Sequence, residues 1–236
     1  MSSNFMVIIE MTFNISYLIY ISLIVVFMSK NLKKVNENEF KTAKNILFAF
    51  ISLLIGDFGH VGARLIILFS KNNSINLALF GIGVLFEMIG LTFLFIFYTN
   101  AWRIHFNRPN DVLFKFLIGI GIVGLIIFTF PQNHWITDSP SYEWVVIRNV
   151  PWLIQGIIIA ILIIRDAKAV HDPHLTKIGF LILLSLFFYC PVIFFGHIEP
   201  RLGILMIPGT FIFMLWQYTS YRRFFKESKL YNSKLT

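Results

Sequence analysis

Three ionisable residues, Asp57, His60 and Arg64, lie inside an apolar run that is long enough to cross a bilayer. An ionisable group at membrane depth costs about 3 kcal/mol or more, so such groups usually face a bundle interior or a wet cavity. At about 100° per residue, their i, i+3, i+7 spacing places all three within roughly 60° of the helix circumference. Gly59 and Gly62 fall on the opposite side and predict a face that another helix can approach closely. The run therefore predicts one helix with a charged face and a separate small-residue face.

These side chains could bind a ligand or move a proton. Arg64 could hold a carboxylate or a phosphate through two parallel hydrogen bonds. Asp57 could hold a cation or exchange a proton, and His60 could carry protons. Four further polar residues occupy the apolar runs that follow, which gives a predicted ligand pocket of Asp57, His60, Arg64, Glu87, Arg148, Asn149 and Gln155. The same charges could instead pair across helices for a purely structural purpose, and the sequence leaves both interpretations open.

The residue types argue against several kinds of chemistry. Cys190 is the single cysteine, which excludes an internal disulfide and a cysteine-based metal cluster. The chain has no zinc-binding helix motif of the H-E-x-x-H type. The last apolar run contains no lysine for a retinal Schiff base and no histidine for a hydrolytic zinc site. We therefore predict no metal and no cofactor, and we assign no catalytic residue.

Composition predicts the elements that position these groups. The chain is 57% hydrophobic and only 14% charged, with 27 phenylalanines, which lies outside the range of soluble domains. We expect an all-α, multi-pass protein of the cell membrane that forms one domain over 1–236. Its seven predicted transmembrane helices cover residues 6–29, 43–69, 76–101, 112–130, 144–165, 175–195 and 201–220.

Lysine and arginine gather in alternate connections. The segments after the first, third and fifth predicted helices are rich in them, as is a short basic tail over 221–236, whereas the other connections hold few. The positive-inside rule then predicts the N-terminus outside and the C-terminus in the cytoplasm. The net charge of +8 indicates anionic lipid headgroups as partners rather than nucleic acid. A cytoplasmic protein could also dock on the basic inner loops.

This orientation converts residue numbers into depth. The ionisable residues of the predicted pocket fall in the outer half of the membrane. We expect only milder polarity in the inner half, from Tyr98, Asn100 and Gln217. Pro151, Pro191 and Pro208 lie inside the last three predicted helices. Each is expected to kink or open its helix, because proline lacks a backbone donor and clashes with the preceding turn.

Several short patterns resemble an uncharacterised family of prokaryotic seven-helix membrane proteins. They are Gly56-Asp57-Phe58-Gly59-His60 with Arg64, Arg148-Asn149-Val150-Pro151, Phe188-Tyr189-Cys190-Pro191 and Met206-Ile207-Pro208. The resemblance implies a fold and a set of residues, and it carries no reaction. The chain departs from the family at Ala63, where a proline is usual, and at Val84 and Gly209, where lysines are usual.

The leading hypothesis is a protein that binds a small or lipid-like ligand in an outward-facing intramembrane pocket, as a receptor or a carrier does. The alternative is an intramembrane enzyme that acts on a lipid or isoprenoid by acid–base chemistry, with Asp57, His60 or Glu87 as the acting group. A third reading is an assembly protein whose buried charges only fix the register of its helices.

Overall fold

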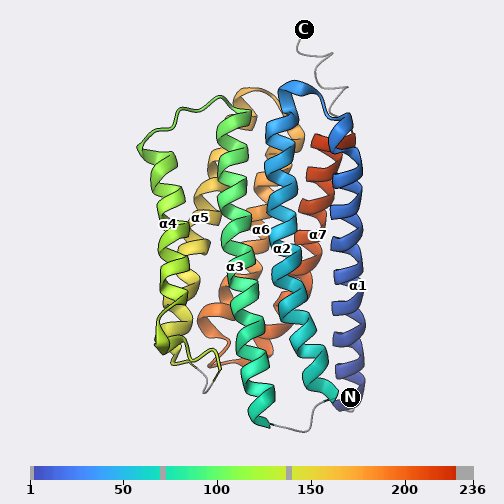
Figure 1. The fold of residues 1–236 in the computed structure, drawn as a ribbon, viewed down its shortest axis with the longest axis vertical. Helices are drawn as coiled ribbons and strands as arrows, with labels where there is room; N and C mark the ends of the chain where they lie inside the picture. The colour runs from blue at the N-terminus through green and yellow to red at the C-terminus, as the bar shows by residue number, and fades with distance from the viewer. Residues whose placement is uncertain (1–2, 70–72, 137–139, 227–236) are drawn as a thin grey trace.

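The computed structural model describes residues 3–69, 73–136 and 140–226, and this part of the chain is helical with no strand. The α-helices form a bundle and run along the long axis of the molecule (Figure 1). These are α1 Ser3–Asn31, α2 Glu37–Phe69, α3 Asn73–His105, α4 Val112–Phe128, α5 Tyr142–Ala169, α6 Pro173–Phe195 and α7 Met206–Tyr221. Short helical turns join or extend them: η1 Leu32–Lys34, η2 Pro131–Asn133, η3 Pro200–Leu205 and the π-helical η4 Arg222–Lys226. The predicted all-α class is confirmed.

In the described part of the chain, six helical segments are long and apolar enough to cross a membrane. The last of them is formed by η3, α7 and η4 together over Pro200–Lys226, and the 17-residue α4 is a shorter apolar helix. Large apolar side chains also cover the outside of the bundle. On α1, an exposed stripe is formed at i, i+4, i+8 and i+11 by Ile15, Ile19, Leu23 and Val26. A water-soluble monomer rarely exposes so extended an apolar surface. The chain is therefore a multi-pass membrane protein.

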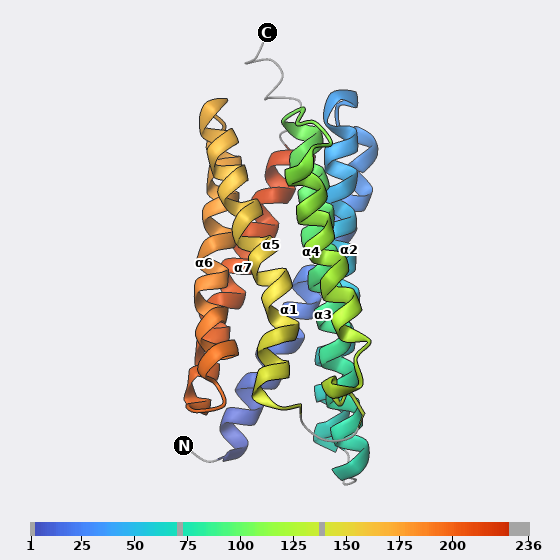
Figure 2. The same cartoon turned by 90° about the vertical axis from the view of Figure 1, so that its left-hand side faces the viewer.

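Consecutive helices run in opposite directions, so their connections alternate between the two ends of the bundle (Figures 1 and 2). We call the end near the N-terminus, where α2 finishes and α3 begins, the N-terminal end. The opposite end, where α7 and η4 finish, is the C-terminal end. The predicted topology places the N-terminal end outside the cell.

Local sequence explains where the helices begin. The Asp111 carboxylate caps α4 by accepting a hydrogen bond from the Phe114 amide at 3.0 Å. The Asp172 carboxylate caps α6 in the same way, and Pro173 occupies the first helical position, where no amide donor is needed. Pro208 is predicted to kink the last helix from a position inside it. It lies instead in the first turn of α7, because η3 replaces the beginning of the predicted helix.

Glycines bring α2 and α3 into very close contact. A Cβ atom built on Gly56 would lie 2.8 Å from the backbone oxygen of Phe86 and 3.1 Å from the Cα of Gly90. A Cβ on Gly59 would meet the Phe86 side chain, whereas one on Gly62 would meet nothing within 4 Å. The predicted small-residue face is thus correct for Gly59 only. The backbones of α2 and α3 come close together at Gly56 and Gly90.

An aromatic cluster fills the middle of the bundle around the fully buried Trp216. The Trp216 ring centroid lies 4.7 Å from that of Phe213, 5.0 Å from Tyr98, 5.9 Å from Phe50 and 6.1 Å from Phe95. The indole N–H also donates to the Tyr98 hydroxyl at 2.8 Å. This layer separates a polar cavity toward the N-terminal end from buried ions at the C-terminal end.

The C-terminal end contains a buried ion cluster, which the sequence did not predict. Arg223 of η4 donates to Glu39 of α2 at 2.8 Å and to Asp172 at 2.7 Å, and its side chain is 3% exposed. All three residues lie just outside the predicted helices 43–69, 175–195 and 201–220, so the cluster lies at the end of the bundle and not in the inner half of those helices, for which milder polarity is predicted. Residues 221–226 of the predicted basic tail are helical and hold this cluster, and the remainder of that tail lies outside the described residues.

Candidate functional site

A cavity of about 210 Å³ lies between α1, α2, α3, α5, α6 and α7, on the N-terminal side of the aromatic cluster. We call it the central cavity. Five of the seven predicted pocket residues line it: Asp57, His60, Arg64, Glu87 and Asn149. Much of the remaining wall is apolar, and Phe95 and Phe213 of the aromatic cluster form part of it. The cavity thus combines a few ionisable groups with an apolar surround, as ligand sites usually do.

Asp57 is positioned by a hydrogen bond from another helix. Its carboxylate accepts from the Tyr17 hydroxyl of α1 at 2.6 Å, and the residue is only 8% exposed. A hydrogen bond to a charged group is worth about 1.5–3 kcal/mol, so this contact helps a buried carboxylate to persist. Tyr17 is not among the predicted pocket residues. Ser16, Tyr20 and Ser22 also carry hydroxyl groups in this part of the first helix, so the sequence alone does not single out Tyr17.

His60 and Glu87 face each other across the contact between α2 and α3. The imidazole Nδ1 lies 3.3 Å from a Glu87 carboxylate oxygen, although the pair lacks the alignment of a hydrogen bond. The His60 side chain is 13% exposed and that of Glu87 is 27% exposed. A carboxylate at this distance would form an ion pair with the imidazole in its protonated form.

Arg64 lines two neighbouring cavities. Besides the central cavity, it borders a second space of about 200 Å³ between α1, α2 and α3, which we call the side cavity. Asn14 is the other residue common to both cavities. The remaining walls of the side cavity are apolar and come from Met11, Leu65, Ile67, Leu68 and Phe80. The cationic Arg64 side chain therefore lies between the central cavity, which several polar groups line, and the largely apolar side cavity.

The three predicted pocket residues on α5 lie in different surroundings. Asn149 lines the central cavity, and its amide oxygen accepts from the Trp152 indole at 3.0 Å. Arg148 does not line the cavity; its guanidinium stacks 4.7 Å from the Trp135 ring. Gln155 is fully buried and donates to the backbone oxygen of Leu117 on α4 at 3.1 Å.

The structure adds lining residues that the sequence analysis did not select. Tyr189 of α6 and Thr210 of α7 share a hydrogen bond of 3.1 Å in the cavity wall. Pro151 and Pro191 lie inside α5 and α6, close in sequence to lining residues of those helices. Ser185 also lines the cavity, but its hydroxyl donates to the Ile182 carbonyl rather than to a base. The wall thus contains hydroxyl groups that can bind a polar ligand, without an activated nucleophile.

No metal centre is evident in the described part of the chain. There, no group of three or more histidine, cysteine, aspartate or glutamate side chains is arranged to hold a metal ion. Asp57, His60 and Glu87 share the central cavity without forming such a group. Their arrangement is suited to hydrogen bonding, ion pairing and proton exchange.

Fold and site together define a helical membrane protein with an internal polar cavity. Comparisons with family models, with curated proteins and with solved structures find no match to this chain. The resemblance to the seven-helix family consequently stays a prediction. What the site can do chemically is therefore inferred from the residues that line the central cavity and from the distances between them.

Proposed function

We propose that this protein binds a small amphiphilic or lipid-like ligand in the central cavity, as a carrier or a receptor does. The observation that carries this proposal is the grouping of Asp57, His60, Arg64 and Glu87 in one cavity with largely apolar walls. Ionisable groups at membrane depth are costly, so a space that gathers four of them is a candidate functional site.

The two neighbouring cavities indicate the class of ligand. Ligand sites commonly measure about 300–1,000 Å³, so the central cavity alone suits only a small molecule. The side cavity adds a nearly equal volume with apolar walls next to Arg64. A ligand with a polar head in the central cavity and an apolar portion in the side cavity fits both.

The site lies toward the N-terminal end, which the positive-inside rule places outside the cell. On the opposite side, the aromatic cluster around Trp216 and the ion cluster of Arg223 close the bundle. A carrier must open these barriers while the outer side closes, whereas a receptor needs only to shift helices and engage a cytoplasmic partner. Uptake into proteoliposomes would favour the carrier, and co-purification of a cytoplasmic protein would favour the receptor.

The second candidate function is an intramembrane enzyme acting on a lipid or isoprenoid. The observation that favours it is the 3.3 Å approach of His60 to Glu87, because a histidine beside a carboxylate is a common general base. Incubation of the purified protein with a lipid extract, followed by mass spectrometry, tests for turnover. A product that forms with the wild type and not with His60→Gln would support the enzyme.

Binding in the central cavity is tested by mass spectrometry of the small molecules and lipids that co-purify with the protein. Glu87→Gln keeps the shape of the side chain and removes its charge. Val84→Phe fills part of the cavity wall and leaves every charge in place. We expect Glu87→Gln to retain about tenfold less ligand than the wild type, since a charge-assisted hydrogen bond is worth about 1.5–3 kcal/mol. Val84→Phe is also expected to retain less ligand, because its larger side chain takes up space that the ligand needs.

Glu199→Gln is the matched control, because it removes a carboxylate in the exposed connection before η3. It is expected to retain the ligand fully. If both cavity variants are folded and carry the same molecules as the wild type, the binding proposal is wrong. If Glu87→Gln unfolds while Val84→Phe folds and keeps its ligand, Glu87 serves structural pairing only.

A further inference from the structure

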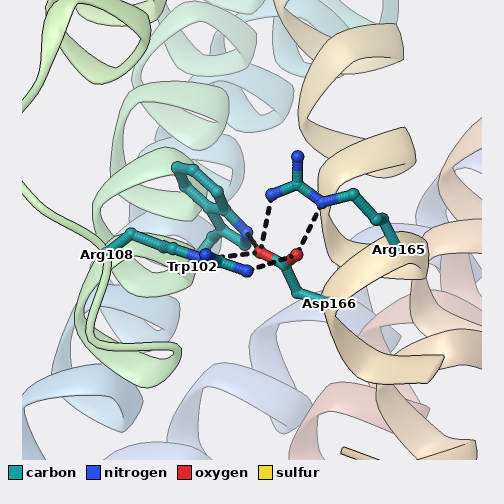
Figure 3. A network of polar contacts seen from close by, with 4 residues as sticks. All are labelled: Trp102, Arg108, Arg165 and Asp166. Carbon is teal, nitrogen blue, oxygen red and sulfur yellow. Dashed lines mark hydrogen bonds and ion pairs between the residues drawn. The ribbon is translucent and has the colours of Figure 1, made fainter. Parts of the chain in front are cut away.

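A second polar site lies at the C-terminal end of the bundle, around Asp166 of α5 (Figure 3). This residue is 2% exposed and accepts five hydrogen bonds. The Trp102 indole donates at 2.9 Å, Arg108 donates through Nε and Nη2 at 3.0 and 2.8 Å, and Arg165 donates through Nε and Nη2 at 2.7 and 3.1 Å. One buried carboxylate therefore holds two guanidinium groups.

The charges of this site are not balanced. Two guanidiniums face one carboxylate, so the site carries one net positive charge. The Arg223 cluster has the opposite composition, with one guanidinium between two carboxylates, and it is sealed from the surroundings. The side chains of Arg108 and Arg165 are instead 42% and 55% exposed. An additional anion can therefore reach them and would relieve the repulsion between two adjacent cations.

Both arginines also have N–H groups left that can donate hydrogen bonds to such an anion. A guanidinium has five N–H groups in a fixed planar fork, and each fork here uses only its Nε and Nη2 on Asp166. Figure 3 shows the third nitrogen of Arg165 pointing away from the carboxylate. Because Asp166 already fixes both side chains, an incoming phosphate has less side-chain entropy to remove than at free arginines.

Apolar surface continues from these arginines along α5. Ile161, Ile157 and Ile154 lie four, eight and eleven residues before Arg165, on one broad face of the helix, and are 52%, 38% and 41% exposed. A ligand whose phosphate sits on the guanidiniums would place its hydrocarbon chains along this face. A free phosphate ion would make no use of it.

We propose that Arg108 and Arg165 form a binding site for the phosphate headgroup of an anionic phospholipid, whose acyl chains lie along the isoleucines of α5. The site is separate from the central cavity and does not depend on which ligand that cavity takes. It would fix a lipid at the end of the bundle where α3, α4 and α5 meet.

The test is native mass spectrometry of the full chain in detergent, titrated with three lipids of identical acyl chains. Phosphatidylglycerol supplies an anionic phosphate headgroup, phosphatidylcholine a zwitterionic one, and diacylglycerol none. We expect retention to fall in that order. An interfacial arginine favours an anionic surface by about fivefold, so Arg108→Gln with Arg165→Gln is expected to weaken phosphatidylglycerol binding by about 25-fold.

Two further variants make the result specific. Lys177→Gln removes one positive charge from exposed α6 surface at the same end and is expected to bind as the wild type does. The double variant Arg108→Lys with Arg165→Lys keeps both positive charges near Asp166, so the carboxylate stays paired. It loses the bidentate hydrogen bonding that a guanidinium group provides. It is expected to bind less phosphatidylglycerol than the wild type.

The proposal is overturned if the wild type binds the three lipids equally, or if the glutamine or lysine double variant keeps the wild-type preference. It is also overturned if Lys177→Gln loses as much binding as the glutamine double variant, because general surface charge would then explain the effect. Displacement of phosphatidylglycerol by millimolar inorganic phosphate would identify a free-phosphate site instead of a lipid site.

Discussion

Arg223→Met is expected to lower the free energy of unfolding by about 3–5 kcal/mol, because it leaves buried charges without their partner. Glu39 and Asp172 are 7% and 6% exposed, and both accept hydrogen bonds from this guanidinium. The variant changes the net charge of the cluster from −1 to −2 in a space that water hardly reaches. Unfolding of the purified protein in detergent, followed by intrinsic tryptophan fluorescence, measures the loss.

Arg201→Met is the control for Arg223→Met, since its side chain is 89% exposed and pairs with Glu199 at 2.7 Å. Exposed ion pairs contribute little, so no measurable loss is expected. Combining Arg223→Met with Glu39→Gln and Asp172→Asn should restore most of the stability, because the triple variant buries no unpaired charge. Equal losses in the Arg223 and Arg201 variants would show that the buried cluster is not a structural element.

Gly56→Ala is expected to destabilise the protein by about 1–3 kcal/mol, the usual cost of overfilling a packed interface. The new methyl group would lie 2.8 Å from the backbone oxygen of Phe86 and 3.1 Å from the Cα of Gly90. Neither atom can move aside without separating α2 from α3. Because Asp57 and Glu87 follow this contact on the two helices, the same change should also widen the central cavity.

Gly62→Ala provides the matched control on the same helix, because its methyl group would meet nothing within 4 Å. It is expected to leave the unfolding temperature unchanged or slightly raised, since alanine favours the helix by up to about 1 kcal/mol over glycine. If Gly56→Ala is as stable as Gly62→Ala, the close approach of α2 and α3 is not required for folding.

The helices were largely predictable because each must bury its backbone polar groups within a membrane-length apolar run. The end of the last helix was not. The sequence places Arg223 in a short basic cytoplasmic tail, since a cation after an apolar run usually marks the membrane boundary. Its partners Glu39 and Asp172 are distant in sequence, and no local pattern identifies a pairing of that kind.

The part of the candidate site that lies on a single helix was predictable from the sequence. Asp57, His60 and Arg64 share one face of α2, and helical periodicity alone groups them. Arg148 and Gln155 also share a face with each other, but that face contacts Trp135, in the connection after η2, and α4. The rotation of α5 about its own axis is set by its packing against α6, α4 and α3, which one sequence does not reveal.

The short helix α4 has a further consequence for the surrounding lipid. At about 1.5 Å per residue, its 17 residues extend roughly 26 Å, less than the hydrocarbon thickness of about 30 Å. As a seventh span, α4 would require the bilayer beside it to thin by a few ångströms. Thinning draws headgroups toward the ends of α4, and its beginning lies just after Arg108. Hydrophobic mismatch at one side of the bundle would thus make the protein sensitive to acyl-chain length and favour membranes of lower thickness.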